Sequence, residues 1–326
     1  MNNIRLYFML LLCFPMFCLA QQELSLHTLT DVWQANRLNP ALMPENGLTI
    51  GLPSIYNRFS IENIKLDELL AEDSGGTTSI NLEVALPKLK QNNQVGNRFS
   101  LETLSFDFRL KNEVHLSLHH ATQVDVSLNY PKQLAELIWL GNAAFIGETV
   151  SFAPQVEVLA YHEFGLGLAK GIGDFIDVGA KVKLLNGIGH IGTTAANNQL
   201  NLLTSDDVYQ LQLEANYEIN TSALLNYDNF GTLDIGFPSG GFQLSDLVSK
   251  NVGIAFDVGG IIRFERANVS LSILDIGGIR WRTKVKNYKL EGTYEYDGID
   301  IIGDYLEGTS SFEYVTDSLR AAFAVE

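Results

Sequence analysis

The strongest constraint on the fold is an alternation of apolar and polar side chains that runs far beyond the length of an ordinary strand. The clearest example is VHLSLHHATQVDVSL, residues 114–128, and similar patterns run through residues 177–184, 209–217 and 251–264. A period of two places alternate residues on opposite faces of a β-strand. The pattern therefore predicts an all-β protein whose antiparallel strands have one apolar and one polar face.

The length of these segments favours a transmembrane barrel over a soluble sheet. Strands of globular proteins average about five or six residues, whereas a barrel strand crossing a bilayer needs about nine to eleven. The polar face also carries charges, at Lys181, Lys183, Asp257 and Arg263. We expect these four residues to face a lumen, with the apolar residues facing lipid. A soluble β-sandwich with one wet face per sheet explains the alternation equally well, but explains the strand length less well.

The N-terminus reads as a cleavable secretory signal over residues 1–20. Arg5 precedes an apolar stretch, and Ala20 is a small residue at the position that signal peptidase reads. The apolar stretch is short for an uncleaved membrane anchor, which is the alternative. Cleavage would remove Cys13 and Cys18, so the mature chain would lack thiols, disulfides and cysteine-ligated metals.

The net charge and local sequence patterns give further information on possible partners, on turns and on one short helix. The net charge of −16 disfavours binding to nucleic acid. Tight turns are predicted at Gly173-Asp174 and near residues 265–268, each between two alternating segments. The stretch YPKQLAELIWLG, residues 130–141, predicts a short helix with Pro131 in its first turn.

No residue pattern predicts an enzyme, a cofactor or a metal site. His115 and His119 share a strand face but lie roughly 13 Å apart, too far to bind one ion. The stretch GLGLAKGIGD lacks the full glycine fingerprint of a nucleotide loop. Asp206 and Asp207 lack the pattern of known calcium loops. A hydrolase whose catalytic residues come from separate strands stays open, but no feature selects it.

The segment WQANRLNPALMP, residues 33–44, raises a resemblance to a known superfamily. A signal peptide, a short polar stretch, Asn39-Pro40-Ala41 and then long alternating strands resemble the long-chain fatty-acid transporters of the outer membrane. In that superfamily an N-terminal segment with an Asn-Pro-Ala motif forms a plug inside the barrel. The resemblance implies a plug-like segment over residues 21–60, with the motif at Asn39, Pro40 and Ala41, and a barrel domain over residues 61–326.

Further stretches look like an uncharacterised family of outer-membrane barrels related to the porin-like components of type IX secretion. The resembling stretches include NYPKQLAELIWLGNAAFIGETV, AYHEFGLGLAKGI, GIAFDVG and LSILDIGGIRWRTKVKNY. One feature departs from such barrels, which normally end in a strand. Residues 316–323 have a helical pattern instead, and alternation gives about ten or eleven strands at most. We therefore expect that the last strands of the barrel are missing from this chain.

The sequence thus predicts a barrel in the outer membrane of a Gram-negative bacterium, with outer-membrane lipid around it. By resemblance, its function would be the transport of an apolar small molecule. An alternative is an accessory or scaffold subunit for protein secretion or surface attachment, with envelope or secretion proteins as partners. A further alternative is a soluble periplasmic β-protein.

Overall fold

The computed structural model describes most of the chain between residues 33 and 296. The described residues are 33–44, 46–65, 70–72, 78–80, 82–206, 210–226, 234–235 and 251–296. The predicted signal peptide at residues 1–20 and the helical pattern at residues 316–323 lie outside them, as does Asp207.

Long strands make up most of the described chain. The strands are β1 (Leu48–Gly51), β2 (Ser54–Ile61), β3 (Leu70–Glu72), β4 (Thr78–Ile80), β5 (Asn92–Arg109), β6 (Val114–Pro131), β7 (Thr149–Ser151), β8 (Gln155–Ile172), β9 (Ile176–Thr204), β10 (Leu211–Ser222), β11 (Leu225–Asn226), β12 (Asp234–Ile235), β13 (Val252–Phe264), β14 (Ala267–Arg280) and β15 (Val285–Tyr296). The helices are short: η3 (Trp33–Arg37), α3 (Leu82–Lys88), η4 (Lys111–Glu113), α4 (Lys132–Leu140) and η5 (Asn142–Phe145). None of the described helices has the length and apolar character needed to span a membrane.

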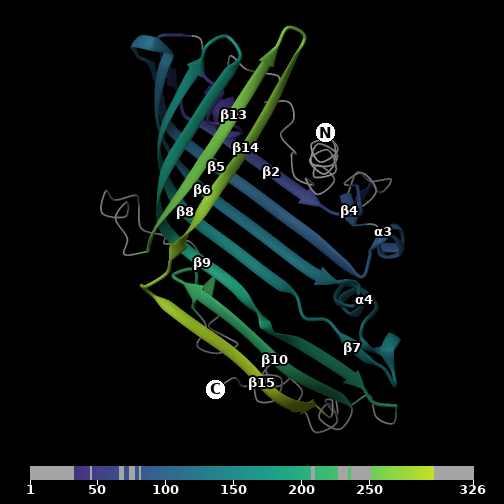
Figure 1. Cartoon of the computed structure of the whole chain (residues 1–326). Coiled ribbons are helices and arrows are strands. Elements are labelled where there is room, and N and C mark those ends of the chain that lie inside the picture. Colours follow the sequence, from purple (N-terminus) through teal and green to yellow (C-terminus); the bar gives the residue numbers. More distant parts are fainter. Residues whose placement is uncertain are drawn as a thin grey trace, which may run out of the picture.

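Eleven strands form one antiparallel sheet, in which the order β1-β5-β6-β8-β9-β10-β15 is extended by β2, β7, β13 and β14 (Figure 1). Two further pairs, β3–β4 and β11–β12, are separate small sheets. The prediction of an all-β, antiparallel protein is confirmed. Over the described residues the large sheet is open, since no pairing joins its two ends.

The two predicted turns and the predicted short helix are present in the structure. The turn at Gly173-Asp174 joins β8 to β9, and residues 265–266 join β13 to β14. The predicted short helix is α4, which begins at Lys132 directly after Pro131. The sheet begins before residue 61, where we expected the barrel domain to start, because β1 and β2 already pair with β5.

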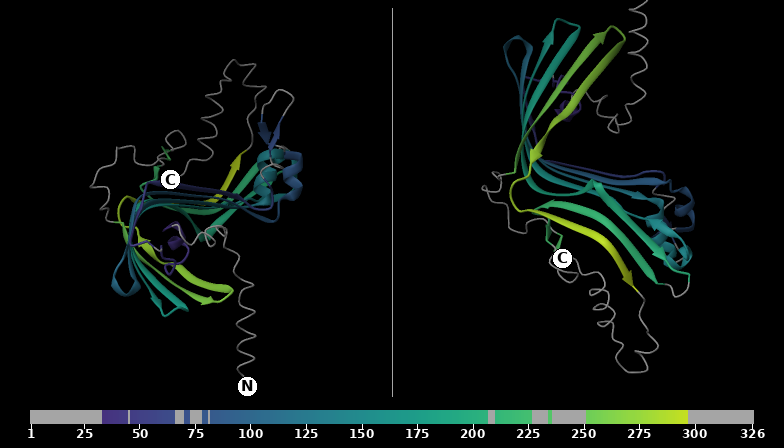
Figure 2. Two further views of the ribbon diagram at one scale, coloured as in Figure 1. Left: turned by 90° about the horizontal axis from the view of Figure 1, so that it is seen from above. Right: turned by 60° about the horizontal axis from the view of Figure 1, so that its bottom comes forward.

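The sheet divides in two at β9, the longest strand, with 29 residues. Its first part, Ile176–Asn186, pairs with β13, and its later part, from His190 onward, pairs with β10. β5 likewise pairs with β1 near one end and with β2 near the other. We call the part with β1, β13 and β14 the upper half and the part with β2, β7, β10 and β15 the lower half, after their places in Figure 1. Figure 2 shows the two halves diverging from the shared strands.

One buried asparagine holds the point of division together. The Oδ1 of Asn251 accepts hydrogen bonds from the backbone N–H groups of Arg282 (2.7 Å) and Thr283 (3.0 Å). Its Nδ2 donates to Ser222 at the end of β10 (3.3 Å), and its carbonyl accepts from the N–H of Gly187 on β9 (2.7 Å). A single residue, through its side chain and its backbone carbonyl, thereby links the starts and ends of strands from both halves.

The two faces of the upper half differ sharply. On β13 the side chains of Ile254 and Phe256 are 52% and 48% exposed, whereas those of Ala255 and Asp257 between them are 2% and 1% exposed. The same apolar face continues across the neighbouring strands. Its exposed residues include Leu166, Leu168, Val178, Val182, Leu184, Val252, Val258, Ile262, Val269, Leu271, Ile273 and Ile276. We call this apolar side the outer face and the opposite side the inner face.

The lower half is covered at one end by the short helices. Ile64, Ala85, Leu89 and Ala135 form a small buried cluster. Tyr130 and Trp139, among others, pack against it. This cluster seats α3 and α4 beside the ends of β5 and β6.

Candidate functional site

The N-terminal segment Trp33–Pro44 lies against the inner face of the upper half. In Figure 2 (left) this purple segment sits within the curve of the upper strands. Its contacts come from β5, β9, β13 and β14, as the following paragraphs describe. Ala35, Ala41 and Leu42 form a buried apolar cluster with Ile261 of β13. The segment is therefore packed onto the wall by both apolar and polar contacts.

Asn39 is the central anchor of this segment and is fully buried. Its Nδ2 lies 2.8 Å from the Ser270 hydroxyl and 3.1 and 3.2 Å from the carbonyl oxygens of Gly260 and Leu271. Its Oδ1 accepts the N–H of Ala41 at 2.8 Å, which closes a turn around Pro40. Proline suits this buried turn because its φ is fixed and it has no backbone donor to satisfy.

Asn36 and a serine of β14 make further hydrogen bonds that hold the segment in place. The Nδ2 of Asn36 donates to the carbonyl oxygens of Pro40 (3.0 Å) and Leu42 (2.8 Å), so it holds the turn from within. The hydroxyl of Ser272 on β14 donates to the carbonyl of Leu38 at 2.6 Å. The contact between Ser272 and Leu38 joins residues 234 positions apart.

Two glycines make room for the turn. Gly179 of β9 and Gly259 of β13 are direct partners in the ladder. A Cβ atom on Gly179 would lie 2.3 Å from the carbonyl carbon of Pro40, and one on Gly259 would lie 2.0 Å from the Oδ1 of Asn39. Such distances are far inside van der Waals contact, so any side chain at either position would displace the segment.

The four charged residues predicted to face a lumen all lie on the inner face. Lys181 is 3% exposed and donates to the backbone carbonyl of Asn36 at 2.7 Å. Lys183 contacts Asp257 at 2.8 Å. Near the tips of the upper strands, Arg263 binds Asp177 of β9 at 2.6 Å. The structure thus brings Lys181 into direct contact with the N-terminal segment, pairs Lys183 with Asp257, and pairs Arg263 with Asp177.

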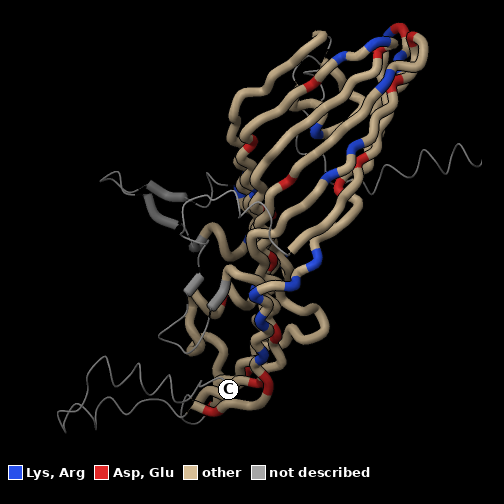
Figure 3. Tube along the Cα trace, turned by 90° about the vertical axis from the view of Figure 1, so that its left-hand side faces the viewer, with Lys and Arg blue, Asp and Glu red and all other residues tan. Residues whose placement is uncertain are grey.

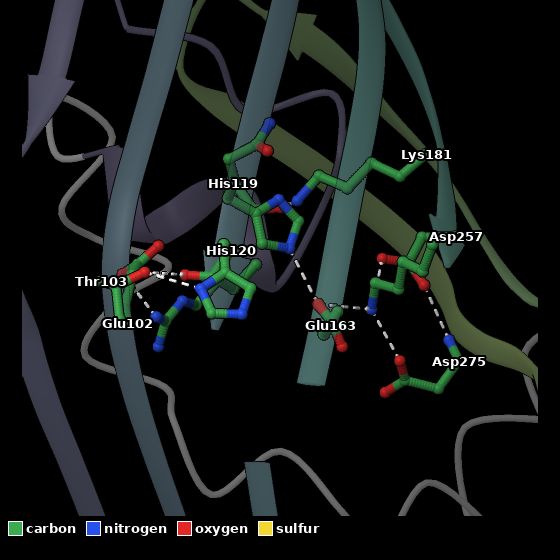
Figure 4. A network of polar contacts seen from close by, with 11 residues as sticks. Glu102, Thr103, His119, His120, Glu163, Lys181, Asp257 and Asp275 are labelled. Atoms are coloured by element: carbon green, nitrogen blue, oxygen red, sulfur yellow. Dashed lines mark hydrogen bonds and ion pairs between the residues drawn. The ribbon is translucent and has the colours of Figure 1, made fainter. Parts of the chain in front are cut away.

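Lys183 is the centre of a buried network, shown in Figure 4. Besides Asp257, it contacts Asp275 at 2.6 Å and Glu163 at 3.8 Å. The N–H of Asp275 donates to Asp257 at 2.8 Å, and His119 lies 2.8 Å from Glu163. The network therefore runs across four strands, β6, β8, β9 and β13, and reaches β14.

The histidines take separate partners. His115 lies 2.8 Å from Asp107 on the inner face, apart from the pair of His119 and Glu163. His120, on the opposite side of the strand from His119, lies 2.7 Å from the hydroxyl of Thr103. Among the described residues, no group of histidine, cysteine, aspartate or glutamate has the arrangement to hold a metal ion.

The sequence analysis missed one buried ion pair beneath the segment. Arg37 binds Glu102 of β5, whose side chain has no exposure, and the hydroxyl of Ser54 donates to the same carboxylate at 3.2 Å. The guanidinium also lies 5.5 Å from the centre of the Trp33 ring. Arg37 and Glu102 are 65 positions apart, and no spacing rule relates them. The only signal in the sequence was the group of polar residues Gln34, Asn36, Arg37 and Asn39, which indicated that the segment would need polar partners.

Charges also mark the tips of the upper half. Figure 3 shows Lys, Arg, Asp and Glu gathered at the ends of the upper hairpins. The turns there contain Lys111, Glu113, Asp174, Glu265 and Arg266. The apolar outer face is therefore bounded by charged tips on one side and by the division at β9 on the other.

Comparisons with known proteins place the chain in one family. A search of curated proteins and a search of solved structures gave no match. A family model described as "Family of unknown function (DUF5723)" matches residues 40–326, from the Pro40 turn to the end of the given sequence. On this match over most of its length, the chain belongs to the DUF5723 family of unknown function.

Proposed function

We propose that the upper half forms part of the wall of an outer-membrane β-barrel and that Trp33–Pro44 is the plug that controls passage through it. The observation that carries the proposal is the contrast between the two faces of the upper strands. The outer face exposes a continuous field of Leu, Ile, Val and Phe, while the inner face is charged and covered by a polar turn. That arrangement suits lipid on one side and an aqueous lumen on the other.

The strands of the upper half are long enough to cross a membrane. β10 and β15 of the lower half have 12 residues each, so the exposed side chains, and not strand length, distinguish the two halves. A tilted transmembrane strand needs about nine to eleven residues. β13 has 13 residues and β14 has 14, which is enough to cross. β9 has 29 and would extend far beyond the hydrocarbon layer. In this proposal its later part belongs to the lower half, outside the bilayer.

The proposal also requires closure of the wall. Lipid cannot satisfy the backbone groups of an unpaired strand edge, so spanning sheets are closed. Over the described residues, β1 and β14 are the edges of the upper half. In the membrane these edges must be paired, with each other or with further strands.

The seating of the plug combines strong anchors with unsatisfied atoms. Near the plug, the buried atoms Trp33 Nε1, Ser105 Oγ, Ser100 Oγ and Glu102 Oε1 have no hydrogen-bond partner among the described residues. Each such atom costs about 1–3 kcal/mol relative to a satisfied one. This cost lowers the stability of the seated plug and favours its displacement when a solute passes. By its resemblance to the long-chain fatty-acid transporters, the proposed solute is an apolar small molecule.

Conductance through reconstituted protein tests this function. The unaltered chain and two variants are each inserted into planar bilayers. G179V adds a side chain that must displace the plug from the wall, and G278A is the matched control. A Cβ on Gly278 meets nothing within 4 Å. We expect low conductance for the unaltered chain and for G278A, and a several-fold increase for G179V. Equal conductance for all three, or failure of the folded chain to insert, would contradict the proposal.

A second measurement addresses the solute. Liposomes containing each variant take up a fluorescent fatty acid, with a fluorescent sugar phosphate as the polar comparison. Faster entry of the fatty acid than of the sugar phosphate supports transport of an apolar molecule. The reverse order would leave the plugged barrel in place but refute the solute class.

A further inference from the structure

The lower half contains a groove whose lining differs from the other cavities of the molecule. It has a volume of about 660 Å³ and lies where β5, β6, β7, β8 and β9 approach one another beside α4. Its lining residues are Asn92, Asn129, Tyr130, Pro131, Ser151, Ala153, Gln155, Asn198, Gln199, Leu200 and Asn201. Pockets for small ligands typically have volumes of about 300–1,000 Å³, so the groove has a suitable size.

None of these lining residues is charged, although the chain carries a net charge of −16. Two other cavities, in contrast, are lined by charged residues. One, of about 300 Å³, is lined by Arg109, Glu113, Asp174, Asp177 and Arg263 among others. Another, of about 460 Å³, includes Arg58, Glu62, Arg98, Asp125 and Glu157. The uncharged lining of the 660 Å³ groove therefore distinguishes it from these two cavities.

The amides of the groove are available to a ligand. Within the part of the chain that the structure describes, the side chains of Asn92, Asn129, Gln155 and Gln199 make no hydrogen bond. An amide side chain offers both donors and an acceptor, which matches a hydroxyl group that also donates and accepts.

Neighbouring residues hold the groove in a fixed shape. Ser151 donates to the Oδ1 of Asn201 at 2.7 Å, which ties β7 to β9 at the groove wall. Tyr130 packs against the buried cluster under α3 and α4, so its ring has a fixed position. A fixed aromatic ring gives an apolar surface on which the flat face of a sugar ring can lie, while the amides bind its hydroxyl groups.

We infer that this groove is a binding site for a neutral oligosaccharide. The inference rests on the combination of an uncharged lining, unpartnered amides and a fixed tyrosine. A charged ligand would find no counter-charge there, and a purely apolar ligand would leave the amides unsatisfied. The site does not depend on the proposed transport function, because the groove lies in the lower half, away from the plug.

Binding is tested with the full chain in detergent against a panel of soluble glycans. The neutral probes are maltohexaose, cellohexaose, xylohexaose and chitohexaose, and the anionic probes are oligogalacturonate and a sulfated heparin fragment. We expect at least one neutral probe to bind, with an affinity that is insensitive to added salt because no ion pair forms. Failure of every neutral probe, or tighter binding of the anionic probes, would overturn the inference.

Variants locate the binding in the groove. The triple variant N92A/Q155A/Q199A removes three amides without breaking any hydrogen bond of the described protein, and we expect it to weaken binding by at least about tenfold. The control N268A/N287A removes two exposed amides on β14 and β15 and should bind as the unaltered chain does. Equal binding by the triple variant and the control would refute the site.

Hydrogen–deuterium exchange gives a second test that needs no variant. With the bound probe present, exchange should slow at residues 129–131 and 198–201 and stay unchanged at residues 285–296. Protection confined to other residues would overturn the assignment even if the probe binds.

Discussion

The upper and lower halves of the sheet are built partly from the same strands, yet they expose different chemistry. In the upper half, β13 alone presents six large apolar side chains to the outside: Val252, Ile254, Phe256, Val258, Ile262 and Phe264. In the lower half, β2 presents Ile55 and Phe59, β15 presents only Val285, and β10 presents none among the described residues. The sequence of β10, LQLEANYEINTS, nevertheless alternates between apolar and polar residues, as that of β13 does over Val252–Val258. The difference shows that alternation specifies a strand, whereas the residue types on its two faces specify its surroundings.

The interiors of the two halves differ as well. The inner face of the upper half holds the buried pair of Lys183 and Asp257, and the N-terminal segment is held there by Glu102 and Lys181. The lower half has more exposed ion pairs, Lys289–Glu291 and Arg98–Asp125, and contains both a cavity with charged lining and an uncharged groove. We interpret the upper half as the membrane-embedded, plugged part and the lower half as the part in water. Each of the following changes tests that difference.

The largest effect is expected from a charge on the outer face of the upper half. F256K would place an ammonium group in lipid, at a cost of about 2–4 kcal/mol near the middle of the bilayer. We expect the variant to be lost from the outer-membrane fraction. V285K, at the exposed apolar position of β15, is the control and should assemble normally. Equal yields of the two variants in isolated outer membranes would contradict the proposal that the upper half faces lipid and the lower half faces water.

Removing one member of the buried pair under the plug should have the next largest effect. E102A leaves Arg37 without its partner. Because the Arg37 side chain is 24% exposed, the cost should lie below the about 3–5 kcal/mol that is typical of a fully buried pair. The expected result is faster tryptic cleavage after Arg37. In the double variant R37M/E102Q both charges are gone, so much of the resistance should return. A double variant that is cleaved faster than E102A would contradict this role for the pair.

Asn39 should have a moderate effect on the same readout. N39A removes the donor to Ser270, Gly260 and Leu271, and the expected loss is about 1–3 kcal/mol of plug seating. Tryptic cleavage after Arg37 should accelerate, while the melting of the sheet changes little. N287A, an exposed asparagine of the lower half, should leave the cleavage rate unchanged.

The smallest effect is expected in the lower half. Lys289 is solvent-exposed in its pair with Glu291, and exposed pairs contribute little to stability. K289M should leave the melting temperature unchanged within error. K183M, in contrast, leaves the buried carboxylate of Asp257 without its cation, and this should clearly lower the melting temperature. Similar shifts in melting temperature for both variants would show that the two ion pairs contribute equally to stability.

Much of the fold was predictable from the sequence because its causes are local. The alternation in residues 114–128 predicted β6, and a glycine turn between two alternating stretches predicted the hairpin of β8 and β9. The position of Lys181, Lys183, Asp257 and Arg263 on one face also follows from their parity. These features depend only on neighbours along the chain.

The features that escaped prediction depend on partner choice. The alternation gives no break near Asn186 where β9 changes partner from β13 to β10. Arg37 and Glu102 are joined only by the folded sheet. Gly179 and Gly259 make room for Asn39 and Pro40 only because the register of β9 and β13 places the two glycines opposite each other. The expected barrel appears as an open sheet over the described residues, so its closure stays a prediction.

The most direct test of the account measures which side chains face lipid. Spin labels on single-cysteine variants at Phe256 of β13 and Val285 of β15 report collisions with oxygen, which concentrates in lipid, and with a water-soluble nickel complex. The account predicts that the label at position 256 collides mainly with oxygen in outer-membrane vesicles and the label at position 285 mainly with nickel. Nickel accessibility at both positions would contradict the claim that the upper half lies in the membrane.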